Sequence, residues 1–319
     1  MKNKKILLIV IVSVVVFVGI LFFGVVKLGP AFNLYLFPPS TQQYVDSALK
    51  FMDNGIYAEG DAWKEAKEKA RSSAKEVKDY NEAHDILNEA LKVAGGKHSG
   101  LYVEDDTTTD EQQTEMPAIE LDDDQILYLK VTATEINTPK EYYNSVIDFV
   151  KKNQSDIKGV IIDLRDNVGG DMGPMLATVS PFLEDGTVLE FRMRTRKTAV
   201  TINKGKIKGG GTPVVTEDIK VKNIPIAILQ NNDTASSGEA ILLSFRGLDN
   251  VKTFGEASAG YCSCNGIRYL YDGAMMALTI ASDVARTGEE FCEDPIEPDV
   301  ETSVPLEDAK EWVLQRMER

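Results

Sequence analysis

The hydrophobic pattern near the N-terminus is one uninterrupted apolar run. Residues 6–26 contain no charged side chain, and lysines at positions 2, 4 and 5 precede them. A run of about 21 residues can cross a hydrocarbon core as one helix and is longer than most signal-peptide cores. No small-residue cleavage site follows at 27–32, which favours an uncleaved anchor over a cleaved signal. We therefore expect residues 1–30 to form a cytoplasmic stub and a transmembrane anchor, with the rest of the chain outside the cytoplasm.

The next part of the chain has the period of amphipathic helices. Residues 40–100 contain three such segments, at 41–53, 61–77 and 80–93, with Asn54-Gly55 and Gly60 between the first two. They predict a small helical subdomain. The stretch that follows is polar, acidic and rich in threonine, so residues 101–117 are predicted to be an acidic linker.

From residue 118 onward, short apolar runs alternate with amphipathic segments. The runs predict strands at 126–131, 159–164, 188–193, 199–202, 224–229, 251–254, 267–271 and 275–280. The amphipathic segments predict helices at 139–153, 171–182, 236–245 and 306–317. This order predicts an α/β core with a mixed sheet over residues 118–319.

Composition and charge narrow the choice of partners. The 319 residues are 43% hydrophobic and 27% charged, which is typical of an ordered protein with a substantial core. The net charge of −15 argues against binding to nucleic acid and against broad electrostatic binding to anionic lipid, because both require clustered Lys and Arg. The three cysteines, Cys262, Cys264 and Cys292, lack the spacing of a zinc site, and a disulfide from Cys292 to either of the others stays open.

Two turns of the predicted core place small or polar residues at the start of a helix. Gly169 and Gly170 belong to the first turn, and Ser236 and Ser237 belong to the second. Free N–H groups and the helix dipole at such a position attract negative charge, so the glycine turn is suited to an oxyanion hole. A serine in the second turn would present its hydroxyl to the cleft. A tight turn and a simple helix N-cap are the plainer interpretations.

A serine nucleophile needs a base within hydrogen-bond reach, and the chain contains only two histidines. His84 lies in the middle of a predicted helix, where a structural role is the better interpretation. His98 follows two glycines in a turn and has Ser99 beside it, so its side chain is presented rather than packed. His98 is therefore the candidate base.

Three ordered blocks in the core resemble the tail-specific, or C-terminal-processing, serine peptidase family. They are GVIIDLRDNVGG at 159–170, TASSGE at 234–239 and GEASAG at 255–260, with IEPD at 296–299 as a fourth signal. The resemblance covers residues 117–302 and, more loosely, 40–100. It implies a crotonase-like (ClpP/crotonase-type) core, serine-type peptidase activity on a polypeptide substrate, and no metal or cofactor.

The resemblance also implies roles for individual residues. Ser236 would be the nucleophile, and the N–H of Ser237 would join Gly169 or Gly170 in the oxyanion hole. The position of the lysine in the dyad members of the family is Tyr261 here, so a serine–lysine dyad is excluded at this place.

Tricorn-like members of the family use a histidine beside a serine from the region before the core, and His98 and Ser99 resemble that pair. In those relatives an acidic residue near the Pro-Asp block completes a tetrad. Glu293 is the nearest candidate for that role, with Glu290 and Asp294 as alternatives.

The sequence thus predicts a membrane-anchored, extracytoplasmic serine peptidase. The PDZ module carried by many relatives is not expected, because residues 101–117 are too few to hold one. One alternative is a catalytically inactive peptide- or ligand-binding protein of the same fold, which the missing lysine favours. Another is a surface scaffold that recruits partners through the helical subdomain. The substrate, the choice between terminal and internal cleavage, and the oligomeric state stay open.

Overall fold

The computed structural model describes residues 2–29, 34–103, 115–135 and 138–318, and the chain divides into two compact units. The first, here called the helical unit, comprises Met1–Thr108 and Asn265–Thr279. The second, the core unit, comprises Thr109–Cys264 and Ile280–Arg319. Most of the predicted acidic linker, at 104–114, lies outside the described residues. The sequence did not predict that residues 265–279 belong with the N-terminal helices.

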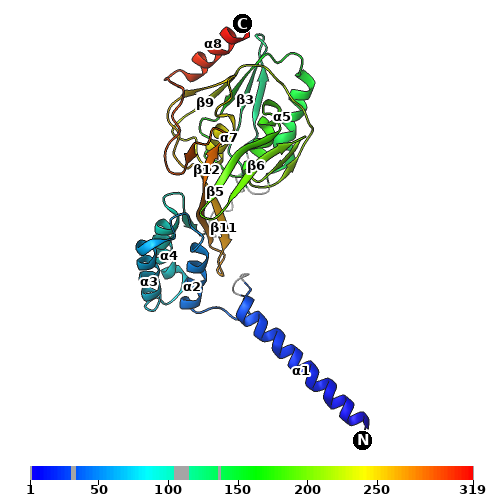
Figure 1. Ribbon diagram of the computed structural model, residues 1–319, viewed down its shortest axis with the longest axis vertical. Coiled ribbons are helices and arrows are strands. Elements are labelled where there is room, and N and C mark those ends of the chain that lie inside the picture. The colour runs from blue at the N-terminus through cyan, green and yellow to red at the C-terminus, as the bar shows by residue number, and fades with distance from the viewer. Residues whose placement is uncertain (1, 30–33, 104–114, 136–137, 319) are drawn as a thin grey trace. The chain divides into compact units, whose positions relative to one another are not determined.

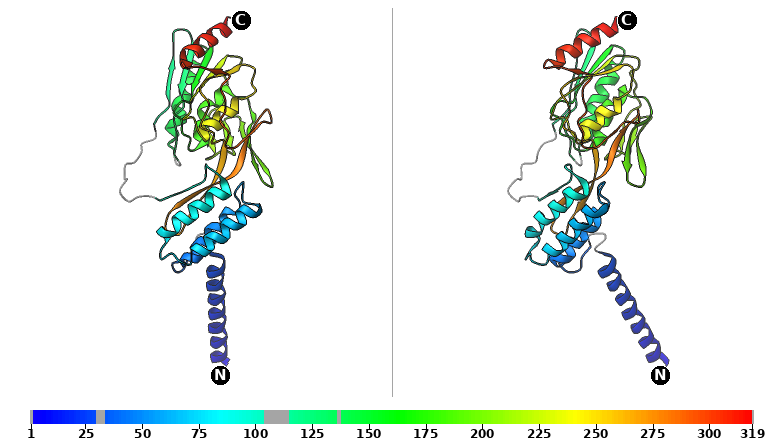
Figure 2. Two further views of the ribbon diagram at one scale, coloured as in Figure 1. Left: turned by 90° about the vertical axis from the view of Figure 1, so that its left-hand side faces the viewer. Right: turned by 60° about the vertical axis from the view of Figure 1, so that its left-hand side comes forward.

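The helical unit begins with a long apolar helix, α1 (Lys2–Leu28), which includes the predicted anchor at 6–26. Its Val10–Leu28 portion is long and apolar enough to cross a membrane, a test that an N-terminal signal sequence also passes. Three shorter helices pack side by side, as Figure 2 shows. They are α2 (Thr41–Met52), α3 (Gly60–Ser73) and α4 (Tyr80–Gly95). Each agrees with a predicted helix within a few residues.

Local chemistry fixes where two of these helices begin. Ser40 and Gln43 form a capping box at α2, in which the Gln43 N–H donates to Ser40 Oγ at 3.2 Å and the Ser40 N–H donates to Gln43 Oε1 at 3.0 Å. Asp79 caps α4 by accepting the Glu82 N–H at 3.0 Å. The buried faces of the helices then pack through Leu49, Leu87 and other fully buried side chains.

A hairpin completes the helical unit. Strands β11 (Ser263–Tyr269) and β12 (Met275–Ala285) pair with each other, and the short strand β1 (Gly100–Tyr102) pairs antiparallel with the start of β12. The hairpin tip is fastened to the helices, because Asp272 accepts hydrogen bonds from the Tyr44 hydroxyl at 3.0 Å and contacts His84 Nε2 at 2.7 Å. The tip of the hairpin is therefore held by side chains from α2 and α4.

The core unit is built on a six-stranded sheet with the order β14-β10-β9-β4-β3-β2. Strands β3 and β9 of this sheet are labelled in Figure 1. All neighbouring pairs are parallel except β2 with β3, so this sheet is mixed, as predicted. The strands are β2 (Ala118–Leu121), β3 (Ile126–Lys130), β4 (Gly159–Asp163), β9 (Ile226–Gln230), β10 (Val251–Gly255) and β14 (Val300–Glu301).

Both faces of this sheet are covered, which explains why β4 and β9 are continuous apolar runs. Side chains on one face pack in the main core with α5 (Lys140–Asn153), α6 (Met172–Val179) and α7 (Ser237–Phe245). Alternate side chains pack on the other face against α8 (Pro305–Met317). A 3-10 turn, η2 (Ser180–Phe182), follows α6, so the helix predicted at 171–182 ends in tighter coiling.

The core unit also contains antiparallel strands that form part of a second sheet. Strand β5 (Gly186–Met193) pairs with residues 281–285 of β12 and with β6 (Lys197–Asn203). The short strands β7 (Lys206–Lys208), β8 (Val214–Val215) and β13 (Glu290–Phe291) extend it. The sequence predicted the longer strands but not their separation into two sheets, because strand pairing depends on contacts between distant segments.

Candidate active site

The predicted nucleophile lies in a strained turn between a buried strand and a helix. Ser236 is the first residue before α7 and has φ +52° and ψ −117°. An ordinary N-cap residue has extended backbone, whereas this conformation is costly for any residue with a Cβ. A serine on a sharp, strained strand-to-helix turn is the arrangement that exposes the hydroxyl of a catalytic nucleophile.

A buried carboxylate holds this turn in place. Glu239 is fully buried in the first turn of α7, and its Oε2 accepts the N–H groups of Ser236 at 2.9 Å and Tyr261 at 2.7 Å. Its Oε1 accepts the Ser258 hydroxyl at 2.5 Å and the Gly260 N–H at 2.8 Å. One side chain therefore fastens the backbone of Ser236 to the 258–261 segment.

The glycine loop after β4 packs directly against the serine. A Cβ on Gly169 would lie 2.8 Å from the Ser236 Cβ, and Gly169 has φ +102°. Both the close approach and the backbone conformation require glycine there. The sequence-predicted glycine turn and serine turn are thus neighbours in the fold.

Asn167 organises the contact between these two turns. It is 1% exposed, and its Nδ2 donates to the Val131 carbonyl at 2.8 Å. Its Oδ1 accepts the Gly169 N–H at 2.9 Å, and its backbone carbonyl accepts the Ala235 N–H at 2.9 Å. Asn167 therefore joins the end of β3, the glycine loop and the serine turn.

These contacts use some of the N–H groups of the two turns and leave others without a hydrogen bond in the described residues. The Gly169 N–H is bound to Asn167, whereas no hydrogen bond in the described part of the chain uses the N–H of Gly170 or Ser237. The Ser237 hydroxyl donates to the Gly170 carbonyl at 2.7 Å and so ties the two loops together. A cavity of about 370 Å³ opens beside this loop, and its lining includes Thr134, Gly169 and Gly170.

The His98 turn belongs to the helical unit and is held by the base of the hairpin. The Asn265 side chain donates to the His98 carbonyl at 3.2 Å. The Ser99 hydroxyl, 1% exposed, accepts the Thr279 N–H at 2.9 Å. Lys92 donates to the carbonyls of Lys97, at 3.0 Å, and of Ser99. The buried Ser99 side chain thus fixes the turn that carries His98.

The surroundings of His98 keep its ring uncharged. Burial, and after it the positive charges of Lys92 and Lys97, lower the pKa of His98 from the usual 6.5 to about 4. A neutral imidazole can accept a proton, which is the first task of a general base.

The other histidine has a structural setting, as predicted. His84 Nε2 lies 2.7 Å from Asp272 Oδ2 and 3.1 Å from the Tyr44 hydroxyl, and the side chain is mostly buried. These contacts attach α4 to the hairpin tip.

The remaining predicted positions lie in the core unit. Tyr261, at the position that the family resemblance assigns to the dyad lysine, donates its N–H to Glu239. Glu290, one alternative for the acidic member, forms an ion pair with Arg192 and accepts the Ser282 hydroxyl at 2.5 Å, whereas Glu293 is half-buried. Among the described residues the structure records no disulfide between these cysteines, a pairing that the sequence left open.

Comparison with known proteins identifies the family. Residues 125–302, more than half of the chain, match the family described as Peptidase family S41. The chain belongs to peptidase family S41. The predicted enzyme class, a serine-type peptidase, is thereby confirmed, and the core has the fold of this family.

Relatives extend the similarity over the whole chain. The nisin-resistance protein of Lactococcus lactis subsp. lactis is 36% identical over 320 residues, which is 99% of each chain. The carboxy-terminal processing protease CtpA of Bacillus subtilis (strain 168) is 26% identical over 187 residues, or 58% of this chain and 37% of that protein. The structure of a lipoprotein from Streptococcus agalactiae superposes with a TM-score of 0.78 and 31% identity, covering 88% of this chain and 99% of that one.

Sequence reasoning overlooked two residues that shape the S41 site. Glu239 and Asn167 both stand inside the blocks that carried the family resemblance, but neither was given a role. The available signal was the carboxyl group of Glu239 or the amide of Asn167 inside a block of mostly small or apolar residues. Such a signal does not predict which backbone groups the side chain will bind.

Proposed function

We propose that this protein is a membrane-associated, extracytoplasmic peptidase in which Ser236 is the nucleophile and His98 is the general base. The observation that carries the proposal is the strained backbone of Ser236, held by Glu239 and pressed against Gly169. His98 is the base because the chain has two histidines and His84 is bound to Asp272 and Tyr44.

The reaction is acyl transfer. His98 takes the hydroxyl proton of Ser236 as Oγ attacks the carbonyl carbon of a peptide bond, and it returns that proton to the leaving amine. Water then attacks the acyl-enzyme, with His98 again accepting a proton, and releases the new carboxyl end and free Ser236.

The N–H groups of Gly170 and Ser237 stabilise the tetrahedral oxyanion in this proposal. Gly169, the other glycine considered from the sequence, acts instead by close packing, because its N–H already binds Asn167. Removing one donor of an oxyanion hole typically lowers the rate by about 10² to 10³.

Ser99 and Glu293 are the proposed supporting members. The Ser99 hydroxyl accepts the Thr279 N–H, so Ser99 would fix the orientation of the His98 turn rather than touch the substrate. Glu293 is the proposed acidic member, as the family resemblance suggests, and Glu290, one of its alternatives, is bound to Arg192 and Ser282.

A peptide of the nisin class is the proposed substrate, and the relative named for nisin resistance, similar over 99% of both chains, supports this choice. The long apolar helix α1 and the similarity to a lipoprotein support a location at the outer side of the membrane. The cavity beside Gly169 and Gly170 is where we place one side of the substrate chain.

The deciding experiment compares the purified full chain with its Ser236→Ala and His98→Ala variants. Each is incubated with nisin and, separately, with a mixed peptide library, and products are identified by mass spectrometry. We expect cleavage by the wild type alone. Cleavage by Ser236→Ala would reject the nucleophile, and an inactive wild type would favour the ligand-binding alternative.

Labelling with a fluorophosphonate separates the two neighbouring serines. Ser236→Ala should abolish labelling, whereas Ser237→Ala keeps its backbone N–H and should still be labelled, though more slowly. Undiminished labelling of Ser236→Ala would contradict the assignment.

A further inference from the structure

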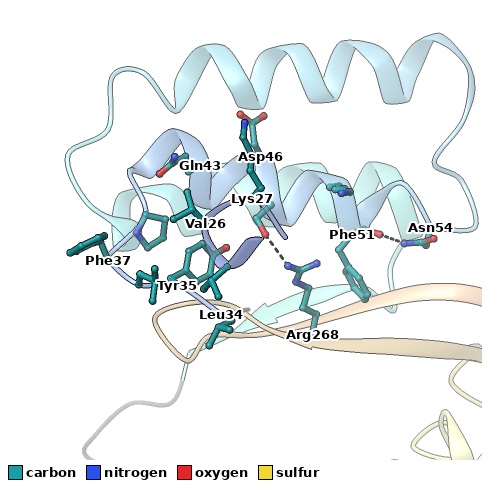
Figure 3. A pocket seen from close by; sticks show the side chains of 15 residues that line it. Val26, Lys27, Leu34, Tyr35, Phe37, Gln43, Asp46, Phe51, Asn54 and Arg268 are labelled. Atoms are coloured by element: carbon teal, nitrogen blue, oxygen red, sulfur yellow. Dashed lines mark hydrogen bonds between the residues drawn. The ribbon is translucent and has the colours of Figure 1, made fainter. Parts of the chain in front are cut away.

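A second cavity, distant in sequence from the catalytic blocks, lies within the helical unit (Figure 3). Its volume is about 560 Å³. Its walls are the end of α1, the segment that follows α1, one side of α2, and Arg268 on β11. None of the residues proposed for catalysis lines this cavity.

Specific contacts build the wall formed by the segment after α1. The Leu34 N–H donates to the Gly29 carbonyl at 2.9 Å, which attaches the start of this wall to the end of the helix. The Tyr35 ring meets the Tyr271 ring edge-on at 5.3 Å. The Tyr80 hydroxyl donates to the Pro39 carbonyl at 2.5 Å, so both ends of this segment are fixed.

The polar part of the cavity carries positive charge. The Arg268 guanidinium donates to the Ser47 hydroxyl at 2.8 Å and lies over the Phe51 ring at 5.8 Å, which holds it against α2. Lys27 and Lys50 are exposed members of the same lining. The acidic side chain in the lining, Asp46, is paired with Arg71 at 2.8 Å. The cavity therefore favours an anion.

The apolar part is exposed to an unusual degree. Leu34 is 55% exposed, Leu36 is 46% exposed and Phe37 is 72% exposed, and all three line the cavity. Neighbouring large apolar side chains left open to water mark a surface that contacts a partner or a membrane. These three follow the apolar helix directly, within ten residues of its last residue, Leu28.

The position fits a lipid. If α1 crosses the bilayer, its end at Leu28 lies at the boundary of the hydrocarbon core, and the cavity lies at the depth of the headgroups. Basic side chains attract anionic headgroups at this depth, and aromatic side chains such as Tyr35 and Phe37 are suited to the interface.

We infer that this cavity binds an anionic phospholipid of the outer leaflet. The phosphate contacts Arg268, Lys50 and Lys27, and the acyl chains lie along Leu34, Leu36 and Phe37. The inference rests on the membrane-anchor part of the proposed function and is independent of the peptidase chemistry.

The test uses the full chain purified in detergent and supplied with equal amounts of phosphatidylglycerol and phosphatidylcholine. Native mass spectrometry counts the lipids retained on the protein. We expect the wild type to prefer phosphatidylglycerol, and the variant Lys50→Gln with Arg268→Gln to lose roughly tenfold or more of that preference. The matched control, Lys64→Gln with Lys75→Gln, removes the same charge from exposed sites on and just after α3 and should keep the preference.

Several results would overturn the inference. They are equal retention of the two lipids by the wild type, an equal loss in the control, or displacement of the lipid by glycerol phosphate alone, which would indicate a site for a soluble phosphate. Should the double variant fail to fold, Lys50→Gln alone, at an exposed side chain, and Leu36→Ser with Phe37→Ser repeat the test. Membrane fractionation reports on the anchor separately, so a failure of the anchor and a failure of the lipid site are distinguishable.

Discussion

At the scale of single residues, the site is defined by what holds Ser236. A non-glycine residue with positive φ persists only when its surroundings over-determine it. Here the Glu239 carboxylate accepts the Ser236 N–H. The backbone of Gly169 packs so closely against Ser236 that a Cβ on Gly169 would lie 2.8 Å from the Ser236 Cβ. The strain is therefore maintained by a buried charge and a missing side chain.

Glu239 should act as a positioning residue. Glu239→Gln replaces one acceptor oxygen with an NH₂ group that faces N–H or O–H donors, so the Ser236 turn should relax. We expect kcat to fall by roughly 10- to 1000-fold, comparable to losing an oxyanion donor, with KM nearly unchanged. Steady-state kinetics on a variant shown by circular dichroism to be folded checks this.

Ser258→Ala is the matched control for Glu239→Gln, because it removes one of the hydrogen bonds to the same carboxylate but keeps the charge. Its effect on kcat should be much smaller. A Glu239→Gln variant that is folded and fully active would show that the carboxylate does not position the nucleophile.

The pH dependence should report the buried setting of His98. Its folded pKa is about 4, below the usual 6.5, so the ring stays neutral and able to accept a proton well below pH 6.5. The acid limb of kcat/KM should therefore have its midpoint nearer 4 than 6.5. Lys97→Gln, which removes a nearby positive charge, should move the midpoint upward. A limb at 6.5 or above would contradict the proposed base.

The same shift affects stability. Between pH 6.5 and 4 the unfolded chain binds a proton on His98 that the folded chain does not, so this residue makes the fold less stable as pH falls through that window.

At the scale of elements, side chains from two helices attach the β11–β12 hairpin to the rest of the helical unit. Its tip is held by Asp272, which binds Tyr44 from α2 and His84 from α4. Burial raises the pKa of Tyr44 far above its usual value, and Asp272 raises it further, so the phenol remains a donor at every working pH.

Tyr44→Phe should loosen this attachment. It removes a hydrogen bond to a charged group and should lower the free energy of unfolding of the helical unit by about 1.5–3 kcal/mol. The control Tyr80→Phe removes a bond to the neutral Pro39 carbonyl, so a loss of about 1 kcal/mol is expected. Urea unfolding followed by near-ultraviolet circular dichroism gives both values. Equal losses would show that the charge of Asp272 adds nothing.

The packing of α8 against the sheet explains why residue 159 is a glycine. A Cβ on Gly159 would lie 2.3 Å from Val313 Cγ1, so glycine at the start of β4 permits the close approach of the helix. Lys310 adds ion pairs to Asp122 at 2.7 Å and Asp124 at 2.9 Å. The amphipathic pattern predicted the helix α8, but it did not predict that the helix would pack against Gly159.

At the scale of the whole molecule, our proposal assigns α1 the role of a membrane anchor. A chain that begins at Leu34 lacks the apolar helix and should appear in the soluble fraction, whereas the full chain should sediment with membranes. The truncated form should keep its activity on a soluble peptide, because the helix carries none of the proposed catalytic groups. Intact-mass measurement of the membrane-bound form is the check, since a mass reduced by the N-terminal segment would show a cleaved signal instead.

The sequence alone determined the features that depend on local pattern. The apolar run at 6–26, the helices at 41–53 and 80–93, and the buried strand at 159–164 all appear in the structure, because side-chain periodicity is a property of neighbouring residues. The family blocks likewise pointed to Ser236 and the glycine loop, since backbone turns with special conformations restrict which residues can occupy them.

Only the tertiary structure decided which distant groups meet. Asn167 is hydrogen-bonded to Gly169 and Ala235, and Glu239 accepts hydrogen bonds from the 258–261 segment. Residues 265–279 belong with the N-terminal helices. The tertiary structure also supplied Asp272 as the partner of His84, to which the sequence had already assigned a structural role. The physical reason is that a hydrogen bond or a packed contact between remote segments is fixed by the shape of the folded chain, which no local pattern of residues encodes.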